Sequence, residues 1–471
     1  MLTSPCLPLL LSLSITIPHV SAQEEAAVAV RGVWIPNSHS TFFESRANVA
    51  EQMEILASSG INVVFPVVWS KGHTLFRSAV AEKVTGHAVD PRYGDRDPLA
   101  EVLFEAHVHG IEVIPWFEYG FAAGHETFPG KALVKHPEWA ALDQSGAPVV
   151  KNGFQWMNSL DPEVQGFLTD MVLECARRYD IDGVQGDDRL PALPAEGGYD
   201  PLTIARYRRE HRRASPPEDI HDVAWTQWRA DILTDYLAEL RAAVKKVRPS
   251  LAFSMAPGGP SWSLRDYLQD QKTWVERGLV DALHPQLYAR DLAGYVSQAE
   301  AMLKIEWLGS RPGVIAPGVL GSFRDYLVSE EDALGAIMAN RARSLGGEVW
   351  FYETSLLSRD GALARALGEG PYAEPARLPW RSRAGWRPAA LEGVRKADGE
   401  EVVFTLTAPE RGTYVIHSEA PESNSESDSE RERWTEVASV RLRSGVPVEV
   451  LRVSAEEAAS IARVIGLVKR D

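Results

Sequence analysis

The sequence predicts an α/β protein with a (β/α)8 barrel of the TIM type, followed by a small C-terminal β-rich domain. Across residues 23–370, short apolar β-runs alternate eight times with segments of helical periodicity. Such alternation indicates a closed parallel sheet. After Leu367 the pattern changes to a Pro- and Arg-rich connector and then to alternating strand-like segments, which predict a separate β-rich module.

The expected strands are short runs rich in apolar and β-branched residues, at 32–36, 62–69, 112–118, 183–187, 251–257, 282–288, 313–319 and 348–354. Helix-like segments lie between them, for example at 47–57, 99–109, 162–178, 225–247 and 331–344. Several strands contain a proline, which is tolerated near strand ends and bulges. These prolines are therefore expected at the mouth of the barrel. The prolines concerned are Pro66, Pro115, Pro257, Pro285 and Pro317.

The chain is expected to divide into a leader, a catalytic domain, a linker and an accessory domain, at residues 1–22, 23–370, 371–390 and 391–471. The leader contains an apolar run at 7–17 and then Val20-Ser21-Ala22, a small-residue pattern that allows cleavage before Gln23. We therefore expect a secreted, periplasmic or cell-envelope protein, with an uncleaved anchor as the alternative. In the accessory domain, strands are expected at 401–407, 413–417, 435–442 and 446–453.

The charge balance disfavours nucleic acid and anionic membrane surfaces as partners. The chain has 49 Lys and Arg against 65 Asp and Glu, a net charge of −16, whereas both kinds of partner attract basic proteins. No segment after the leader is long and apolar enough to suggest a membrane span.

Motifs for cofactors and for other hydrolytic chemistries do not occur in the sequence. There is no His-x-His or His-Glu-x-x-His pair, no Gly-x-Ser-x-Gly elbow, no Walker loop and no dinucleotide fingerprint. Loss of the leader would remove Cys6 and leave Cys175 alone, so the mature chain could form no intrachain disulfide and no cysteine-ligated zinc site. Asp187 and Asp188 could serve as oxygen ligands for calcium or magnesium, but we expect neither a metal nor a cofactor.

Acidic residues follow several predicted strands. Glu118 follows the third strand, Asp187 and Asp188 the fourth, and Glu353 the eighth. In (β/α)8 barrels the active site lies at this end of the strands. Glycoside hydrolysis needs two carboxyl groups, one to protonate the leaving oxygen and one to attack the anomeric carbon or activate water. We therefore expect Asp187 to be the main catalytic carboxylate, with Glu118 or Glu353 as acid/base.

Each of these acids also has a structural interpretation. An aspartate at a strand–loop junction, such as Asp188, often caps a turn or helix. Either glutamate could instead pair with a cation at the mouth, such as Arg31 or Arg189. Asp180 and Asp182 precede the fourth strand, and are therefore expected at the opposite face, which carries stability.

Aromatic and polar residues near the predicted strand ends are candidates for binding sugar. Flat rings can stack on pyranose faces, although a large ring near a barrel rim often packs against loops instead. The aromatic candidates are Trp69, Trp116, Tyr119, Trp156, Tyr288 and Tyr352. The candidates for hydrogen bonds to hydroxyl groups are Asn37, His39, Gln185 and Gln286.

Long segments of the chain resemble the glycosyl hydrolase-like 10 family, most closely its cyanobacterial branch. The matching segments lie within residues 31–360 and include RGVWIPNSHS, IEVIPWFEYGF, YDIDGVQGDD, QWRADILTDY and GEVWFYETSL. The resemblance implies a (β/α)8 barrel that acts on glycosidic bonds of a polysaccharide or glycan, often in an exported protein. It places the family's acid pair on Asp187 and Asp188, whereas equivalents of Glu118 and Glu353 are not shared across the wider family, so it implies no second catalytic residue. Where members of the family commonly continue with an aromatic segment, this chain has Arg189-Leu190-Pro191.

These observations lead us to expect an exported, cofactor-free glycoside hydrolase with a two-carboxylate mechanism. One alternative is a non-catalytic carbohydrate-binding barrel, which would keep Trp116, Trp156 and Tyr288 in a groove. In such a barrel no second carboxyl group would lie within about 10 Å of Asp187. A separation larger than this is outside the ranges for both retaining and inverting hydrolysis. The other alternative is a cell-envelope scaffold, which would show an apolar patch on the C-terminal module.

Overall fold

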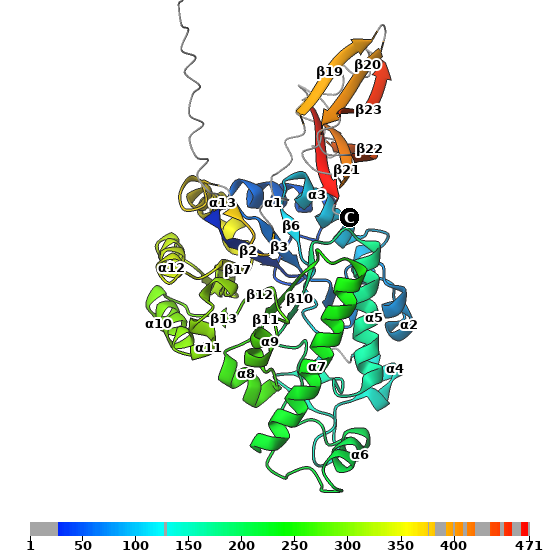
Figure 1. The fold of residues 1–471 in the computed structure, drawn as a ribbon, viewed down its shortest axis with the longest axis vertical. Helices are drawn as coiled ribbons and strands as arrows, with labels where there is room; N and C mark the ends of the chain where they lie inside the picture. Colours follow the sequence, from blue (N-terminus) through cyan, green and yellow to red (C-terminus); the bar gives the residue numbers. More distant parts are fainter. Residues whose placement is uncertain are drawn as a thin grey trace, which may run out of the picture.

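The fold is mixed α/β with a parallel sheet (Figure 1). The computed structural model describes residues 27–126, 130–374 and 376–381, together with the backbone of strands between residues 392 and 469. The expected leader, residues 1–22, and the second half of the expected linker lie outside the described residues.

Each of the eight segments predicted as a strand overlaps a strand, although the segment 313–319 begins in a 3-10 helix (Pro312–Val314) and only its last two residues lie in a strand. The parallel strands are β2 (Val30–Ile35), β3 (Val63–Pro66), β6 (Glu112–Val113), β10 (Gly183–Asp187), β11 (Ala252–Ala256), β12 (Ala282–Leu283), β13 (Gln286–Leu287), β14 (Gly318–Leu320) and β17 (Gly347–Phe351). They pair in the orders β13-β14-β17-β2-β3-β6 and β10-β11-β12. Parallel bridges connect Trp116 with Gln185 and Leu283 with Ile315, between the two groups.

The prolines lie where the strands end or break, because proline has no N–H for the ladder. Pro66 is the last residue of β3, and Pro285 separates β12 from β13. Pro257 directly follows β11, and Pro317 directly precedes β14. The prolines thus lie at strand ends or breaks, but Pro317 is at the N-terminal end of β14 and not at the C-terminal end, where the mouth was expected.

The helices lie outside the strands (Figure 1). They are α1 (Arg46–Ser58), α2 (Ala79–Thr85), α3 (Pro98–Val108), α4 (Lys131–Lys135), α5 (Pro162–Arg178), α6 (Pro201–Glu210), α7 (Val223–Val247), α8 (Pro260–Tyr267), α9 (Gln271–Glu276), α10 (Leu292–Leu303), α11 (Glu306–Gly309), α12 (Glu330–Ala342) and α13 (Thr354–Glu369). Several begin at an Asp or Ser whose side chain accepts an N–H of the first turn, as Asp161 does for α5 and Asp222 for α7. None of the helices in the described part of the chain is both long and apolar enough to span a membrane.

Short antiparallel pairs of strands extend the loops. They are β4 (Trp69–Ser70) with β5 (His73–Thr74), β15 (Ser322–Phe323) with β16 (Tyr326–Leu327), and β9 (Phe154–Trp156) with both β7 (Ala122–His125) and β8 (Val150–Lys151). The first of these pairs and the β7–β9–β8 sheet flank the site described below.

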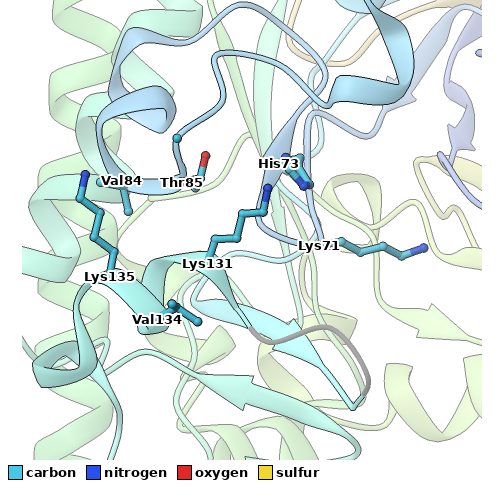
Figure 2. Close-up of a pocket in the computed structure, with 8 residues that line it drawn as sticks. Lys71, His73, Val84, Thr85, Lys131, Val134 and Lys135 are labelled. Atoms are coloured by element: carbon cyan, nitrogen blue, oxygen red, sulfur yellow. The ribbon is translucent and has the colours of Figure 1, made fainter.

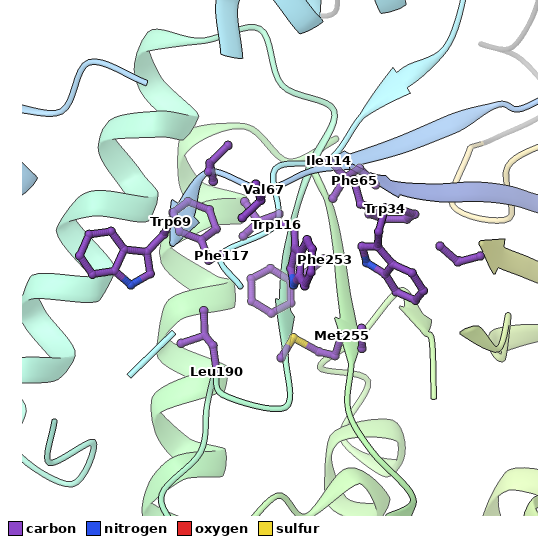
Figure 3. Packing of buried hydrophobic residues seen from close by; sticks show 14 of the residues in the cluster. Trp34, Phe65, Val67, Trp69, Ile114, Trp116, Phe117, Leu190, Phe253 and Met255 are labelled. Carbon is purple, nitrogen blue, oxygen red and sulfur yellow. The ribbon is translucent and has the colours of Figure 1, made fainter. Parts of the chain in front are cut away.

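Trp34 of β2 lies in the hydrophobic core and is 1% exposed. Its indole N–H donates to Oε1 of Gln185 at 2.6 Å, and Nε2 of Gln185 donates to the Ser254 hydroxyl at 3.1 Å. Phe65 and Trp116 pack their rings 6.0 and 6.3 Å from that of Trp34 (Figure 3). Buried polar groups are stable only when hydrogen bonded, and this chain of contacts meets that need for Gln185.

The N-terminal ends of the strands are covered by the first half of the segment expected to be a linker. Within it, β18 (Ala376–Arg377) pairs with β1 (Ala27–Val28). Arg381 donates to Glu112 at 2.7 Å and lies 3.5 Å from an oxygen of Asp182. Arg31 donates to the carbonyls of Tyr372 and Glu374. Arg31 is therefore at this end of the sheet and cannot serve as a cation at the mouth.

Asp182 lies at this stability face, as the sequence indicated. Its Oδ2 accepts hydrogen bonds from His107 at 2.8 Å and from the backbone N–H of Val113 at 3.0 Å. Although burial acts in the opposite direction, His107 and Arg381 lower the pKa of Asp182 to about 2. A carboxylate with a lowered pKa stabilises the fold above the pKa of the unfolded chain and loses that effect as the pH falls through its folded value.

We expect Asp182→Asn to lower the free energy of unfolding at pH 7 by about 2 kcal/mol, because each unit of pKa shift corresponds to about 1.4 kcal/mol. The difference from wild type should shrink as the pH falls from about 4 to 2, measured by urea unfolding. The matched control is Asp180→Asn, since Asp180 pairs with Arg248 and its side chain is 28% exposed. The control should change stability by less than about 1 kcal/mol. Equal losses in both variants would contradict this account.

The C-terminal part contains antiparallel strands in two sheets, ordered β19-β20-β23 and β22-β21-β24. Their bounds are β19 (Glu392–Asp398), β20 (Glu401–Thr407), β21 (Gly412–Glu419), β22 (Trp434–Leu442), β23 (Pro447–Ser454) and β24 (Arg463–Lys469). Four of them overlap the strands predicted there, whereas β19 and β24 were not predicted.

Candidate active site

Three carboxylates surround the guanidinium of Arg189 at the C-terminal ends of two neighbouring strands. Arg189 lies 2.9 Å from Asp187, 3.0 Å from Asp188 and 3.6 Å from Glu118, measured between the nearest nitrogen and oxygen atoms. Its Nε also donates to the backbone carbonyl of Glu118 at 2.7 Å. We call these four residues the acid cluster. Glu118 and Asp187, which follow different strands, thus lie next to the same guanidinium.

Asp187 is the most enclosed member of the acid cluster, at 1% exposure. Its Oδ1 accepts the backbone N–H of Arg189 at 2.9 Å. Its Oδ2 accepts the indole N–H of Trp116 at 3.1 Å and Nη2 of Arg189 at 2.9 Å. Three donors from two elements therefore fix the orientation of this carboxylate, as a preorganised catalytic group requires.

The loop after β10 is held from both sides. On one side, the backbone N–H of Phe121 donates to the Arg189 carbonyl at 3.0 Å. Gly120 allows this approach, because it has φ +47° and a Cβ there would lie 2.2 Å from the same carbonyl oxygen. On the other side, Gln269 donates to the carbonyls of Asp187 and Pro191 at 2.8 and 3.1 Å.

Burial and neighbouring charges act in opposite directions on these acids. Burial raises the pKa of Asp187 well above its ordinary value and also raises that of Glu118, while Arg189 opposes both shifts. The cluster has three carboxyl groups and one arginine. Since close carboxylates disfavour simultaneous ionisation, the cluster is suited to hold a proton on one carboxyl group while another is ionised.

Glu353 lies apart from the acid cluster. It is fully buried, accepts a hydrogen bond from the Ser40 hydroxyl, and leaves Oε2 without a partner among the described residues. Burial raises the pKa of Glu353 to about 8, opposed by the Ser40 hydrogen bond. This glutamic acid is therefore protonated at neutral pH. No contact joins it to Asp187 in the described part of the chain.

Two tyrosines, Tyr288 and Tyr352, lie near the acid cluster. Burial raises the pKa of Tyr288 and of Tyr352. Nearby acids raise both values further: Asp187 and Asp188 act on Tyr288, and Glu118 acts on Tyr352. Both rings are half-buried, and the ring of Tyr288 stacks on Phe351 at 4.6 Å. Both phenols therefore keep their protons at neutral pH and can donate hydrogen bonds to a ligand.

Five of the other expected sugar-binding residues are buried. Trp69, Trp156 and Gln185 are at most 1% exposed, and the two tryptophan rings pack in the hydrophobic core. Trp116 and Tyr119 are 4% exposed; the first reaches the site through its N–H to Asp187 and the second through its ring, 5.9 Å from the Arg189 guanidinium.

Of the expected polar ligands, His39 is exposed. Asn37 is 8% exposed, and its Nδ2 has no partner among the described residues. Gln286 is half-buried and donates to the Ala256 carbonyl at 2.8 Å.

Sequence reasoning missed the central role of Arg189 and two aromatic residues after the fifth strand. Tyr267 accepts a hydrogen bond from Asn152 at 2.7 Å, and burial together with Asp188 raises its pKa to about 12. The ring of Trp262 lies 4.9 Å from that of Tyr267 and is 45% exposed, an unusual exposure for so large a ring. The strand-end rule that selected Trp116 would have found Trp262, because it follows β11 closely.

Within the described residues, no group of three or more His, Cys, Asp or Glu side chains is arranged to hold a metal ion. In the acid cluster, the guanidinium of Arg189 lies against the oxygens of Asp187 and Asp188 that calcium or magnesium would use.

Comparison with known proteins agrees with the resemblance seen in the sequence. The family model described as glycosyl hydrolase-like 10 matches residues 29–308. Glycosyl hydrolase DigH of Escherichia coli (strain K12) is 27% identical over 311 residues, which cover 56% of this chain and 66% of DigH. Glycosyl hydrolase YngK of Bacillus subtilis (strain 168) is 24% identical over 415 residues, 78% of this chain and 76% of YngK. The chain thus spans just under two thirds of DigH.

Solved structures with a similar fold include two from glycoside hydrolases. The PgaB (BpsB) glycoside hydrolase domain of Bordetella bronchiseptica has a TM-score of 0.54 at 11% identity and covers 72% of this chain and 98% of that domain. The catalytic domain of β-amylase from Paenibacillus polymyxa has a TM-score of 0.51 at 12% identity, and the match covers 71% of this chain and 95% of that domain. At these identities the likeness concerns the fold alone.

Proposed function

Because the chain belongs to the glycosyl hydrolase-like 10 family, we propose that it is a glycoside hydrolase that cleaves a polysaccharide or cell-envelope glycan with two carboxyl groups of the acid cluster. The carboxyl groups are those of Asp187 and Glu118, with Tyr288, Tyr352 and Trp262 as contacts for the sugar. No cofactor takes part in the proposed reaction.

The observation that carries this proposal is that Asp187 and Glu118 share one nitrogen of Arg189. Nη2 lies 2.9 Å from Oδ2 of Asp187 and 3.6 Å from Oε1 of Glu118. Those oxygens are therefore no more than about 6.5 Å apart, which is compatible with the separation of about 5–5.5 Å found in retaining glycosidases. The spacing argues against the rival carbohydrate-binding barrel, for which no second carboxyl group near Asp187 was expected.

In the proposed reaction, Asp187 is ionised beside Arg189, and Glu118 carries the proton of the acid cluster. Glu118 protonates the glycosidic oxygen while Asp187 attacks the anomeric carbon and the bond to the leaving sugar breaks. This step leaves a glycosyl ester on Asp187. Glu118, now ionised, takes a proton from water as that water attacks the anomeric carbon, and the ester bond to Asp187 breaks. Arg189 offsets the negative charge of the cluster throughout. Each step conserves protons, and both acids return to their starting states.

The proposal also includes a closed eight-stranded barrel as the scaffold. Parallel pairing links β17 to β2 and β2 to β3, and the bridges at Trp116 and Ile315 join the two groups of strands. In such a barrel the C-terminal ends of all strands converge on one mouth. Convergence would explain why Glu118, Asp187 and Tyr288 lie together.

Export and an accessory domain complete the proposal. Export rests on the apolar run and small-residue pattern of residues 1–22. The accessory role rests on the change to antiparallel strands from β19 onward. Such a domain would assist glycan binding or stability.

The test is hydrolysis of a panel of bacterial and plant polysaccharides by residues 23–471, with released reducing ends counted and the anomer of the first product followed by proton NMR. We expect hydrolysis with retention of the anomeric configuration. Hydrolysis with inversion would remove Asp187 as nucleophile but keep the activity. Binding of a glycan without release of any reducing end would favour the carbohydrate-binding rival.

A further inference from the structure

A pocket of about 420 Å³ lies between the β4–β5 hairpin, the C-terminal end of α2 and helix α4 (Figure 2). Its volume falls within the range of about 300–1,000 Å³ that is usual for small-ligand sites. Three lysines and a histidine dominate its polar lining, beside Val84, Thr85, Gly86 and Val134. We call it the lysine pocket, after Lys71, Lys131 and Lys135.

The positive charges of the lysine pocket are largely uncompensated. Within the described residues, neither Lys71 nor Lys131 has an ion pair or a side-chain hydrogen bond, whereas the Lys135 ammonium donates to the Lys83 carbonyl. Two lysines that line one pocket thus lack an ion pair, in a chain with a net charge of −16. An unpaired cluster of like charges is unfavourable unless an anion binds there.

His73 and its surroundings support the same conclusion. Burial and the Lys131 ammonium lower the pKa of His73, so its imidazole is neutral at pH 7, and its buried Nδ1 has no partner among the described residues. Asp90 is near enough to affect His73. However, Asp90 is already held by Arg92, through two side-chain hydrogen bonds at 2.7 and 2.9 Å. The nearby acid is therefore not available to Lys131.

The lysine pocket adjoins the acid cluster through the β4–β5 hairpin. Lys71 lines the pocket and is also close enough to Glu118 to lower the pKa of that carboxyl group, against the larger effect of burial. Figure 2 shows the Lys71 side chain extending away from Lys131 and Lys135. The hairpin is fixed to the strand end that carries Glu118, since the Tyr119 N–H donates to the Trp69 carbonyl and the Trp69 indole donates to the Gly120 carbonyl, both at 3.0 Å.

We propose that the lysine pocket binds an anionic group of the substrate glycan, a carboxylate, sulfate or phosphate on a sugar next to the one that is cleaved. Lys131 and His73 would hold the anion, and Lys71 would lie between the anion and the acid cluster. This inference rests on the proposed glycosidase function and specifies its substrate class as an acidic glycan. An acidic glycan bound by a strongly acidic protein needs such a local cationic site.

The test measures binding separately from hydrolysis. Titration calorimetry at low salt would use uronic-acid, sulfated and phosphorylated oligosaccharides, each paired with its neutral counterpart, and inorganic phosphate and sulfate alone. The protein would carry Asp187→Asn, so that no substrate is consumed. We expect at least one acidic oligosaccharide to bind about tenfold or more tightly than its neutral partner, because a hydrogen bond to a charged group contributes about 1.5–3 kcal/mol.

Lys131→Met should remove most of this preference, while the matched control Lys272→Met should keep it. Lys272 lies on α9, and its side chain is 57% exposed and lies 3.8 Å from Glu276. Thermal unfolding would establish that the variants remain folded. The proposal is overturned if no acidic member binds more tightly than its neutral partner, if Lys131→Met keeps the preference, or if only the free inorganic ions bind. Hydrolysis without charge preference would support the glycosidase alone, and charge preference without hydrolysis would support the pocket alone.

Discussion

Asp187→Asn should lower kcat/KM for a susceptible glycan by a factor of about 10³ or more, as loss of an essential nucleophile does in other enzymes. Asparagine has nearly the same shape, and its oxygen can still accept hydrogen bonds from Trp116 or Arg189. It cannot, however, form the glycosyl ester. Released reducing ends, counted under single-turnover and steady-state conditions, would measure the loss.

The control for this prediction is again Asp180→Asn, which makes the same chemical change seven residues earlier, at the opposite end of β10. We expect its activity to equal that of wild type. Circular dichroism and thermal unfolding should show that Asp187→Asn is folded, because Arg189 keeps two other carboxylate partners. Full activity in a folded Asp187→Asn protein would exclude Asp187 as the nucleophile and move the chemistry to another acid.

Glu118→Gln should lower the hydrolysis of natural glycans by about 10²–10⁴-fold, the usual contribution of general acid catalysis. The effect should be much smaller in the first step for aryl glycosides, whose leaving groups need little protonation. Added azide should then restore turnover by replacing the water that Glu118 would activate, giving a glycosyl azide of retained configuration. Mass spectrometry and NMR of that product would identify Glu118 as the acid/base.

The pH dependence follows from the same residue. The first step needs a protonated Glu118, so activity should fall as the pH rises through its pKa. Burial raises this pKa, and the fall should therefore occur at a higher pH than the ordinary value of about 4.3 would give. In Glu118→Gln this alkaline fall should disappear. An alkaline fall that persists in Glu118→Gln would assign it to a different group.

The variant Glu353→Gln tests which of the two glutamates, Glu118 or Glu353, is the acid/base. Glu353 has a pKa of about 8 and is protonated at neutral pH, so glutamine should mimic it closely. We expect Glu353→Gln to keep most of the activity at pH 7. If it instead loses activity as Glu118→Gln does, and azide restores it, then Glu353 is the acid/base and Glu118 only stabilises Arg189.

Much of the sheet and several helices could be predicted because their signals are local. Apolar runs of strand length mark β2, β10 and β17, and the helical spacing of apolar residues marks α5. Short helices such as α8 and α9 were not predicted. They contain too few turns for a periodic pattern to appear, and helices this short are stable only when the rest of the protein packs against them.

The candidate site could be predicted in part. The rule that active sites lie at strand C-termini selected Asp187 and Glu118, and Arg189 brings both together. The same rule also selected Trp69 and Trp156, which are buried in the core. Distance from a strand end is readable from the sequence, but the direction in which a ring points depends on neighbours far along the chain.

The sequence by itself determined the family, through the segments that match it. It also determined the order of the strands along the chain and the strand ends that carry acids, because these depend on residue type and local periodicity. Only the tertiary structure decided which acids share a partner. Arg189 donates to the carbonyl of Glu118, 71 residues earlier in the chain, and Lys71 of the β4–β5 hairpin lies near enough to Glu118 to lower the pKa of its carboxyl group. Such contacts depend on loop paths and packing, and the distance between two side chains on different strands is fixed only when the whole sheet has formed.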